Sequence, residues 1–450
     1  MPFQSLTNPA TTRAELMPVI RLSIPLMVGL AAALLIGVVD TAMISPLGTV
    51  PLAAAGVTTA VLIILISALW GVITVISVQI SQAHGAGNFA RVAAALRGGV
   101  ILCLIGGSAG ALLMLALFPL LKPLGQPEEV LTILWPYWVS MALWMIPFTL
   151  FFGLKSLFDA VEWPWTAVAL SYIGVIVNIP ANYTFIHVLD MGLLGAGLAS
   201  ILSQCASLVA AAFVLLRASG LAPYRQRVSI SWVNVKEQGA EAMPLCLGYA
   251  GEGGAYAVVG VMMGWLGAEA LAAHQIVNAL AGLAYMIPLG VAGAASIRIG
   301  QAVGRDHQER LRPILKASFA LVTFWQILVA TLFILAGRHL AATMSTDQVV
   351  IDLATVLFFI VGLLQVADGI QGTALGALRG MSDMRRPTTI TLTAYWVLAL
   401  PACYAFGFLF NLGATGIWLG YTLGLVVAAV ALPLRFWRLT NVPIRAEKNE

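Results

Sequence analysis

The chain has few charged residues. Of its 450 residues, 23 are Lys or Arg and 19 are Asp or Glu, so 9% are charged, whereas soluble domains carry about 25%. So little charge cannot cover a surface that faces water, which excludes a soluble globular protein. The net charge of +4 is small and basic residues lie beside apolar runs, so we expect no nucleic-acid partner.

Cysteine is also scarce, and it forms no pattern. The chain has no C-x-x-C pair, which excludes a thiolate metal site or a disulfide framework and predicts small buried side chains. It also has no H-E-x-x-H or G-x-S-x-G motif, which an intramembrane hydrolase would need. We therefore expect a protein that is not an enzyme and has no resident cofactor. The four cysteines, all in apolar runs, are Cys103, Cys205, Cys246 and Cys403.

Apolar residues, in contrast, are abundant and form long runs. They make up 60% of the chain, and a run of about twenty of them is long enough to cross a bilayer as a helix. We count twelve such runs, which predicts an all-α integral membrane protein. The runs are 19–45, 52–83, 93–119, 130–154, 164–188, 193–216, 239–266, 270–300, 313–336, 349–378, 388–411 and 413–436.

The basic residues predict the orientation of these spans. With twelve spans, both termini lie on the same side of the membrane. Only Lys122 and Arg338 fall on the other side, and every other Lys and Arg falls on the side of the termini. Because cytoplasmic loops are enriched in Lys and Arg, we expect both termini in the cytoplasm of a bacterial-type inner membrane.

The chain repeats itself. At an offset of 219 residues Pro25 falls on Pro244 and Arg91 on Arg310, which predicts two parallel six-helix lobes. Such lobes suit a transporter that exposes a central site to each side in turn. The predicted divisions are a cytoplasmic segment 1–17, a first lobe 18–216, a linker 217–238, a second lobe 239–437 and a cytoplasmic tail 438–450.

Three acidic residues lie deep inside apolar runs: Asp40, Glu252 and Asp368. Each charge costs about 2.5 to 3.5 kcal/mol near the bilayer centre on insertion scales. No basic residue lies deep in a predicted span to pair with them, so each acid should face water, hold a proton or bind a cation. None is repeated in the other half, so duplicated packing does not explain them.

Oxygen-bearing residues accompany each acid. Glycines surround Glu252, and Gln365 and Gln371 share a helix face with Asp368, so Glu252 and Asp368 are candidate Na⁺ ligands. Asn178 and Asn182 lie one turn apart, flank a proline and are candidate neighbours of Asp40. Tight glycine packing and an asparagine pair that holds two helices together are the simpler alternatives.

Two tyrosines flank Glu252 in the seventh predicted span, and a third lies in the eighth. They could attract an organic cation through their ring faces, although ordinary packing explains them as well. The candidates for this substrate cavity are Tyr249, Tyr256 and Tyr285.

These residues resemble the multidrug and toxic compound extrusion (MATE) family, especially its NorM branch. The resemblance runs from about residue 18 to 437 and rests on the order and spacing of its strings. The strings are Val39-Asp40-Thr41-Ala42-Met43, Asn178-Ile179-Pro180-Ala181-Asn182-Tyr183, Gly251-Glu252, Ala273-His274-Gln275-Ile276, Tyr285-Met286-Ile287-Pro288, Ile297-Arg298-Ile299-Gly300, Ala367-Asp368 and Leu378-Arg379-Gly380.

The resemblance implies a two-lobed antiporter that expels cationic, often aromatic compounds in exchange for Na⁺ or H⁺. In that picture Glu252 and Asp368 match the cation-binding acids of the second lobe. Asp40, Asn178 and Asn182 match the polar cluster of the first. The chain departs from the family pattern at Gly253-Gly254, which leaves the ligand set and the ion open.

A flippase for a lipid-linked sugar, or an exporter of another amphipathic metabolite, is the competing hypothesis. Such flippases usually carry basic residues in the cavity to meet phosphate, which this chain lacks deep in its predicted spans. We therefore expect organic cations, Na⁺ or H⁺ and membrane lipid as partners, and a monomer. The sequence leaves the cargo and the coupling ion open, because a carboxylate serves either ion.

Overall fold

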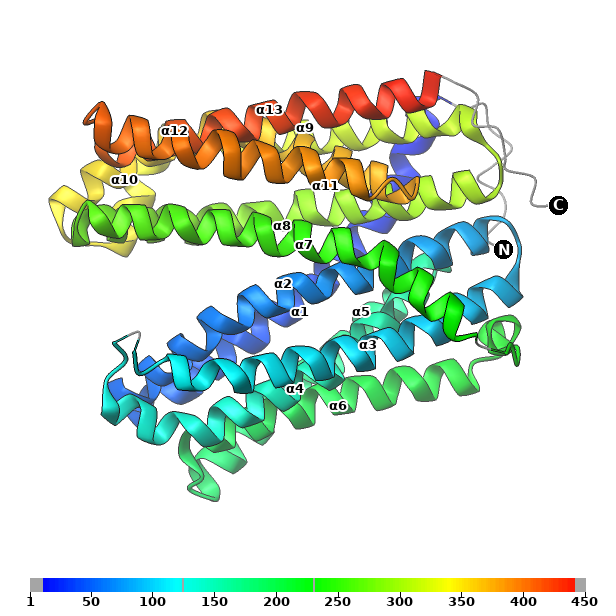
Figure 1. Ribbon diagram of the computed structural model, residues 1–450, viewed down its shortest axis with the longest axis horizontal. Helices are drawn as coiled ribbons and strands as arrows, with labels where there is room; N and C mark the ends of the chain where they lie inside the picture. Colours follow the sequence, from blue (N-terminus) through cyan, green and yellow to red (C-terminus); the bar gives the residue numbers. More distant parts are fainter. Residues whose placement is uncertain (1–10, 124, 230, 442–450) are drawn as a thin grey trace. The chain divides into compact units, whose positions relative to one another are not determined.

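The structure, a computed structural model, describes residues 11–123, 125–229 and 231–441. Twelve of its helical segments are long and apolar enough to cross a membrane, which confirms the predicted all-α fold of twelve spans (Figure 1). The α-helices are α1 (Thr12–Ile44), α2 (Thr49–Gly85), α3 (Phe89–Leu117), α4 (Glu128–Ala160), α5 (Pro164–Tyr183), α6 (Gly192–Arg217), α7 (Trp232–Trp265), α8 (Ala268–Gly304), α9 (Leu311–Met344), α10 (Gln348–Gly380), α11 (Arg385–Leu392), α12 (Leu400–Tyr404) and α13 (Gly413–Asn441).

The chain forms two compact units whose boundaries lie inside helices. The N-terminal unit is Val28–Ala250, and the C-terminal unit comprises the described residues of Met1–Met27 and Gly251–Glu450. Helices α1 and α7 are therefore each divided between the two units. The lobe boundaries expected from the sequence differ from these divisions and stay a prediction, and residues 1–10 and 442–450 of the predicted end segments lie outside the described residues.

Each unit is built around one central helix. In the N-terminal unit α4 packs against α2, α3 and α6, and in the C-terminal unit α10 packs against α8, α9 and α13. These two helices bury a larger share of their apolar stretch than any other span among the described residues. Side chains far from them face outward, as Leu112 of α3 and Leu335 of α9 do, with 68% and 77% exposure, as expected for surfaces that contact lipid.

Proline interrupts one helix of each unit at corresponding places. Pro180 lies in α5, which continues as a π-helix over Thr184–Val188. Pro401 is the second residue of α12 within the eleventh span, and this span has π-helical turns at Thr393–Ala399 and Ala405–Leu409. Proline removes a backbone donor and shifts the helical register, so it changes the direction in which nearby side chains point.

A buried ion network fixes the first part of α1 within the C-terminal unit. Glu15, 1% exposed, accepts hydrogen bonds from Arg298 at 2.6 Å and from Arg310 at 3.0 Å. Nearby, Val19 and Leu26 join a buried cluster with residues of α8, α9, α10 and α13. An acid with two arginine partners and so little exposure has a structural role, because removing one member would leave charges buried without a partner.

Candidate functional site

The second part of α1 places Asp40 in a polar cluster of the N-terminal unit. Its Oδ1 accepts hydrogen bonds from the Nδ2 atoms of Asn178 at 3.1 Å and Asn182 at 2.7 Å. Its Oδ2 accepts one from the hydroxyl of Ser200 on α6 at 2.9 Å. The structure therefore brings Asp40, Asn178 and Asn182 together, around the proline of α5, and adds Ser200, which the sequence did not single out.

The same cluster leaves two oxygen atoms available. Asn178 and Asn182 are fully buried, and the Oδ1 atom of each has no hydrogen-bond partner among the described residues. A buried amide oxygen without a partner costs about 1 to 3 kcal/mol, and amide oxygens are ligands for hard cations. The cluster can therefore accept a cation or a water molecule without breaking the contacts of Asp40.

The other two acids meet in the C-terminal unit. Glu252 of α7 and Asp368 of α10 lie within electrostatic range of one another, so two negative charges would repel there unless a cation or proton is shared between them. Within the described part of the chain, the Asp368 carboxylate makes no hydrogen bond or ion pair. An acid without a protein partner, close to a second acid, is typical of a site that takes up a cation.

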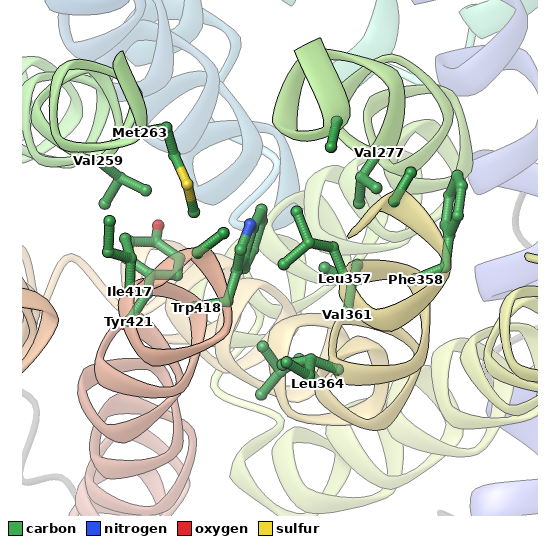
Figure 2. Close-up of a cluster of buried hydrophobic side chains, with 14 of the residues drawn as sticks. Val259, Met263, Val277, Leu357, Phe358, Val361, Leu364, Ile417, Trp418 and Tyr421 are labelled. Atoms are coloured by element: carbon green, nitrogen blue, oxygen red, sulfur yellow. The ribbon is translucent and has the colours of Figure 1, made fainter. Parts of the chain in front are cut away.

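A cavity of about 90 Å³ opens beside Asp368. Two of its lining residues are Trp418 and Gln365. The Nε1 atom of Trp418 and the Nε2 atom of Gln365 are buried and have no hydrogen-bond partner among the described residues. Figure 2 shows two of the lining residues, Trp418 of α13 and Val361 of α10, on neighbouring helices, with Tyr421 on the other side of Trp418. The lining residues are Tyr256, Ala281, Val361, Leu364, Gln365, Asp368, Trp418, Tyr421 and Leu425.

The surroundings of Glu252 differ from those of Asp368. The Gln371 amide lies beside Glu252, but it is fully buried and makes no hydrogen bond of ordinary geometry to any described residue. Arg379 also lies within electrostatic range of Glu252. Arg379 is thus a basic neighbour of Glu252 that the predicted spans did not include. Arg379 directly follows the predicted span 349–378 but lies in α10, which continues to Gly380, and its side chain is long enough to extend back along the helix.

The three candidate tyrosines lie in three different places in the structure. Tyr256 lines the cavity with Asp368, and the hydroxyl of Tyr285 lies against Gly372, next to Gln371 in the chain. Tyr249 belongs to the N-terminal unit, where its hydroxyl is 3.2 Å from that of Thr74 on α2.

Two further aromatic residues contribute to the cavity, Trp418 and Tyr421. They lie one turn apart on α13, but nothing in their sequence context distinguishes them from residues of a membrane interface.

Comparisons with known proteins agree with this architecture. The MatE family profile matches residues 25–184 and 244–405, one segment in each repeat. A probable multidrug resistance protein NorM of a Synechococcus species is 30% identical over 96% of both chains. The corresponding protein of Xanthomonas axonopodis pv. citri is 30% identical over 92% of both chains. The chain belongs to the MatE family. The members of this family are transporters, so this integral membrane protein is a transporter and not an enzyme.

Solved structures confirm the fold. A MATE transporter of Vibrio cholerae in the bent form has a TM-score of 0.86 at 21% identity, over 96% of this chain and 98% of that one. A transporter of Pyrococcus furiosus has a TM-score of 0.85 at 20% identity, over 95% and 96%, and the reversed polarity of its binding pocket suggests a different function for it. The fold alone therefore does not decide the cargo.

Proposed function

We propose that the chain is a secondary active antiporter that exports cationic, amphipathic drugs or toxic metabolites in exchange for Na⁺ or H⁺. The observation that carries this proposal is that Glu252 and Asp368 lie within electrostatic range of one another. Asp368 lines a largely apolar and aromatic cavity and has no hydrogen-bond or ion-pair partner among the described residues. The multidrug resistance names of the NorM relatives support the choice of cargo. The protein acts as a monomer in lipid and needs no resident cofactor.

The coupling ion and the organic cation compete for the same carboxylates, and this competition couples the transport of one to that of the other. A Na⁺ ion or a proton that binds Glu252 and Asp368 neutralises the charge that attracts an organic cation. An ion that enters from outside therefore weakens cargo binding and promotes release, and departure of the ion restores the negative charge. This exchange requires only that each ligand bind one conformation better than the other. Asp40 with its two asparagines is a second cation or proton site in the same cycle.

Purified protein in liposomes tests this function. An inward Na⁺ gradient or pH gradient should drive movement of ethidium in the opposite direction, and an anionic dye of similar size should not move. The proposal fails if neither gradient drives ethidium, or if the anionic dye is exported equally well. Export of the anionic dye alone would favour the flippase or metabolite exporter instead, because phosphate-bearing cargo needs a site of opposite charge.

We also propose that both termini are cytoplasmic in the bacterial plasma membrane, with Lys122 and Arg338 outside. The distribution of basic residues supports this orientation. Lys122 forms an exposed ion pair with Glu128 at 2.6 Å, and Arg338 forms one with Asp352 at 2.7 Å. A reporter fused after the last residue should be active only in the cytoplasm, and activity only in the periplasm would reverse the orientation.

A further inference from the structure

The buried ion network around Glu15 contains more positive than negative charge. The Glu15 carboxylate accepts hydrogen bonds from both Arg298 and Arg310, so one acid serves two guanidinium groups. Arg298 is 9% exposed and Arg310 is 5% exposed. Because arginine stays protonated inside proteins, the network keeps one positive charge that Glu15 does not balance. A buried charge without a counter-charge is costly.

A small cavity lies against the two arginines. Its volume is about 10 Å³, which is room for about one water-sized particle. The Nε atom of Arg298 is buried and has no hydrogen-bond partner among the described residues, so the protein does not use every donor of this guanidinium. Among the described residues no acid lines the cavity, and its charged or polar lining residues are Arg298, Gln301, Arg305, His307 and Arg310.

The acids that lie next to this network in the sequence have other partners. Glu309 lies 2.8 Å from Nδ1 of His307, and its side chain is 56% exposed. Asp306 is exposed and accepts a hydrogen bond from Gln308 at 3.3 Å. Neither acid lines the cavity, so neither supplies the counter-charge that the buried arginines lack.

We infer that this cavity is a binding site for a small monovalent anion such as chloride, which completes the ion network that holds the first part of α1 in the C-terminal unit. The anion supplies the missing negative charge and accepts charge-assisted hydrogen bonds from guanidinium groups. Chloride is only slightly larger than a water molecule, whereas phosphate and sulfate need more room than this cavity has. The site is separate from the proposed coupling site, because it uses none of the three intramembrane acids.

The repeat supports a role for this charge. At the offset of 219 residues, Arg298 falls on Gln79 and Glu15 falls on Asn234, and both of these residues line a cavity of the N-terminal unit. That cavity has two acids and one arginine among its described lining residues, so its charge has the opposite sign. The positive charge of the C-terminal cavity is therefore no requirement of the shared scaffold. The charged lining residues of the N-terminal cavity are Arg91, Glu237 and Glu241.

Thermal unfolding of the full-length protein in detergent tests anion binding. Sodium gluconate is replaced stepwise by sodium chloride, so that the Na⁺ concentration and the ionic strength stay constant, and gluconate is too large for the cavity. A ligand that binds only the folded protein raises the unfolding temperature. We expect chloride to raise it by at least about 3 °C and to saturate. In crystals, bromide should replace chloride, and its anomalous signal should lie beside Arg298 and Arg310.

Gln301→Glu supplies the missing charge from the protein itself. Gln301 is 2% exposed and lines the cavity, and the exchange keeps the size of the side chain. In gluconate this variant should unfold at the temperature of the wild type in saturating chloride, and it should no longer respond to chloride. Gln82→Glu makes the same exchange at the corresponding position of α2 and should keep the wild-type response.

A second variant keeps the test available if Gln301→Glu folds poorly. Arg305→Gln removes a partly buried arginine from the cavity wall and should raise the half-saturating chloride concentration about tenfold, the worth of one hydrogen bond to a charged group. Arg91→Gln, in the cavity of the N-terminal unit, is its control and should leave that concentration unchanged.

The outcomes do not depend on transport, so they stand apart from the proposed function. A wild-type unfolding temperature that is independent of chloride, with no bromide signal beside Arg298, overturns the inference and leaves a water molecule as the occupant. The inference is also overturned if Gln301→Glu responds to chloride as the wild type does. A response to inorganic phosphate that exceeds the response to chloride would likewise overturn it, because the site would then take a larger anion.

Discussion

The two acid clusters of this protein differ in how many hydrogen bonds their carboxylates accept from other residues. Asp40 in the N-terminal unit receives three hydrogen bonds from α5 and α6, whereas Asp368 in the C-terminal unit receives none among the described residues. The atoms left without partners also differ. Beside Asp40 they are amide oxygens, and beside Asp368 they include the Trp418 and Gln365 nitrogen donors.

The Asp40 cluster is therefore held in place by the protein itself, whereas the Asp368 cluster depends on a ligand to complete its hydrogen bonds. A carboxylate held by three donors stays oriented without help, whereas buried polar groups that lack partners are costly. The unpaired nitrogen donors of the C-terminal unit can be completed by a water oxygen, and the Asp368 carboxylate by a cation or a proton. We expect the C-terminal unit to dominate coupling and the N-terminal unit to modulate it.

The largest expected effect is at the unsatisfied acids. Glu252→Gln or Asp368→Asn should lower ion-driven ethidium efflux at least about 100-fold, because an amide neither takes up a proton nor neutralises a cation. Thermal unfolding in detergent should be unchanged or slightly improved, since the burial cost of a charge disappears. Asp352→Asn, at an exposed position of the same helix, is the control. Efflux near the wild-type rate in both variants at a saturating gradient would contradict the assignment.

The next largest effect, on stability, is expected at Glu15, an acid that two arginines neutralise in the structure. Glu15→Gln removes the one carboxylate that Arg298 and Arg310 share, which should cost about 3 kcal/mol of unfolding free energy because buried positive charges lose their counter-charge. Stability should therefore fall, while the half-saturating ion concentration of the folded protein stays at the wild-type value. Denaturant unfolding in detergent and efflux assays measure the two quantities. A change in ion affinity without a loss of stability would place Glu15 in the transport cycle.

The sequence predicted the spans because length and apolarity alone determine them, and it predicted the acids because a charge in an apolar run is conspicuous. Ser200 was missed because serine is ordinary in a helix rich in small residues. Trp418 was missed because a tryptophan near the end of a span indicates a membrane interface. The contact of Asp40 with Asn178 and Asn182 joins two helices far apart in the sequence, and the asparagine pair around a proline and the family resemblance pointed to it.

An intermediate effect is expected at the satisfied acid. Asp40→Asn should lower efflux about tenfold, less than the changes in the C-terminal unit, because the loss of charge affects a site that only modulates coupling. The variant should fold, since the hydroxyl of Ser200 can turn and accept from the new amide. Efflux rates at equal protein density in liposomes provide the measurement. A loss as complete as that of Asp368→Asn would mean that the two clusters are equal partners.

The smallest effect should come from removing one donor of the Asp40 cluster. Ser200→Ala deletes the single hydrogen bond to Oδ2 and leaves both asparagine bonds to Oδ1, so one neighbour of three is lost and efflux should fall about threefold. Ser203→Ala is the matched control. Ser203 is equally buried one turn further along α6, but its hydroxyl donates to the backbone oxygen of Ser200 at 2.9 Å and not to Asp40. The control should therefore keep the wild-type rate. Equal losses in the two variants would trace the effect to packing of α6, and a loss in Ser200→Ala as large as that of Asp40→Asn would mean that the orientation of Asp40 matters as much as its charge.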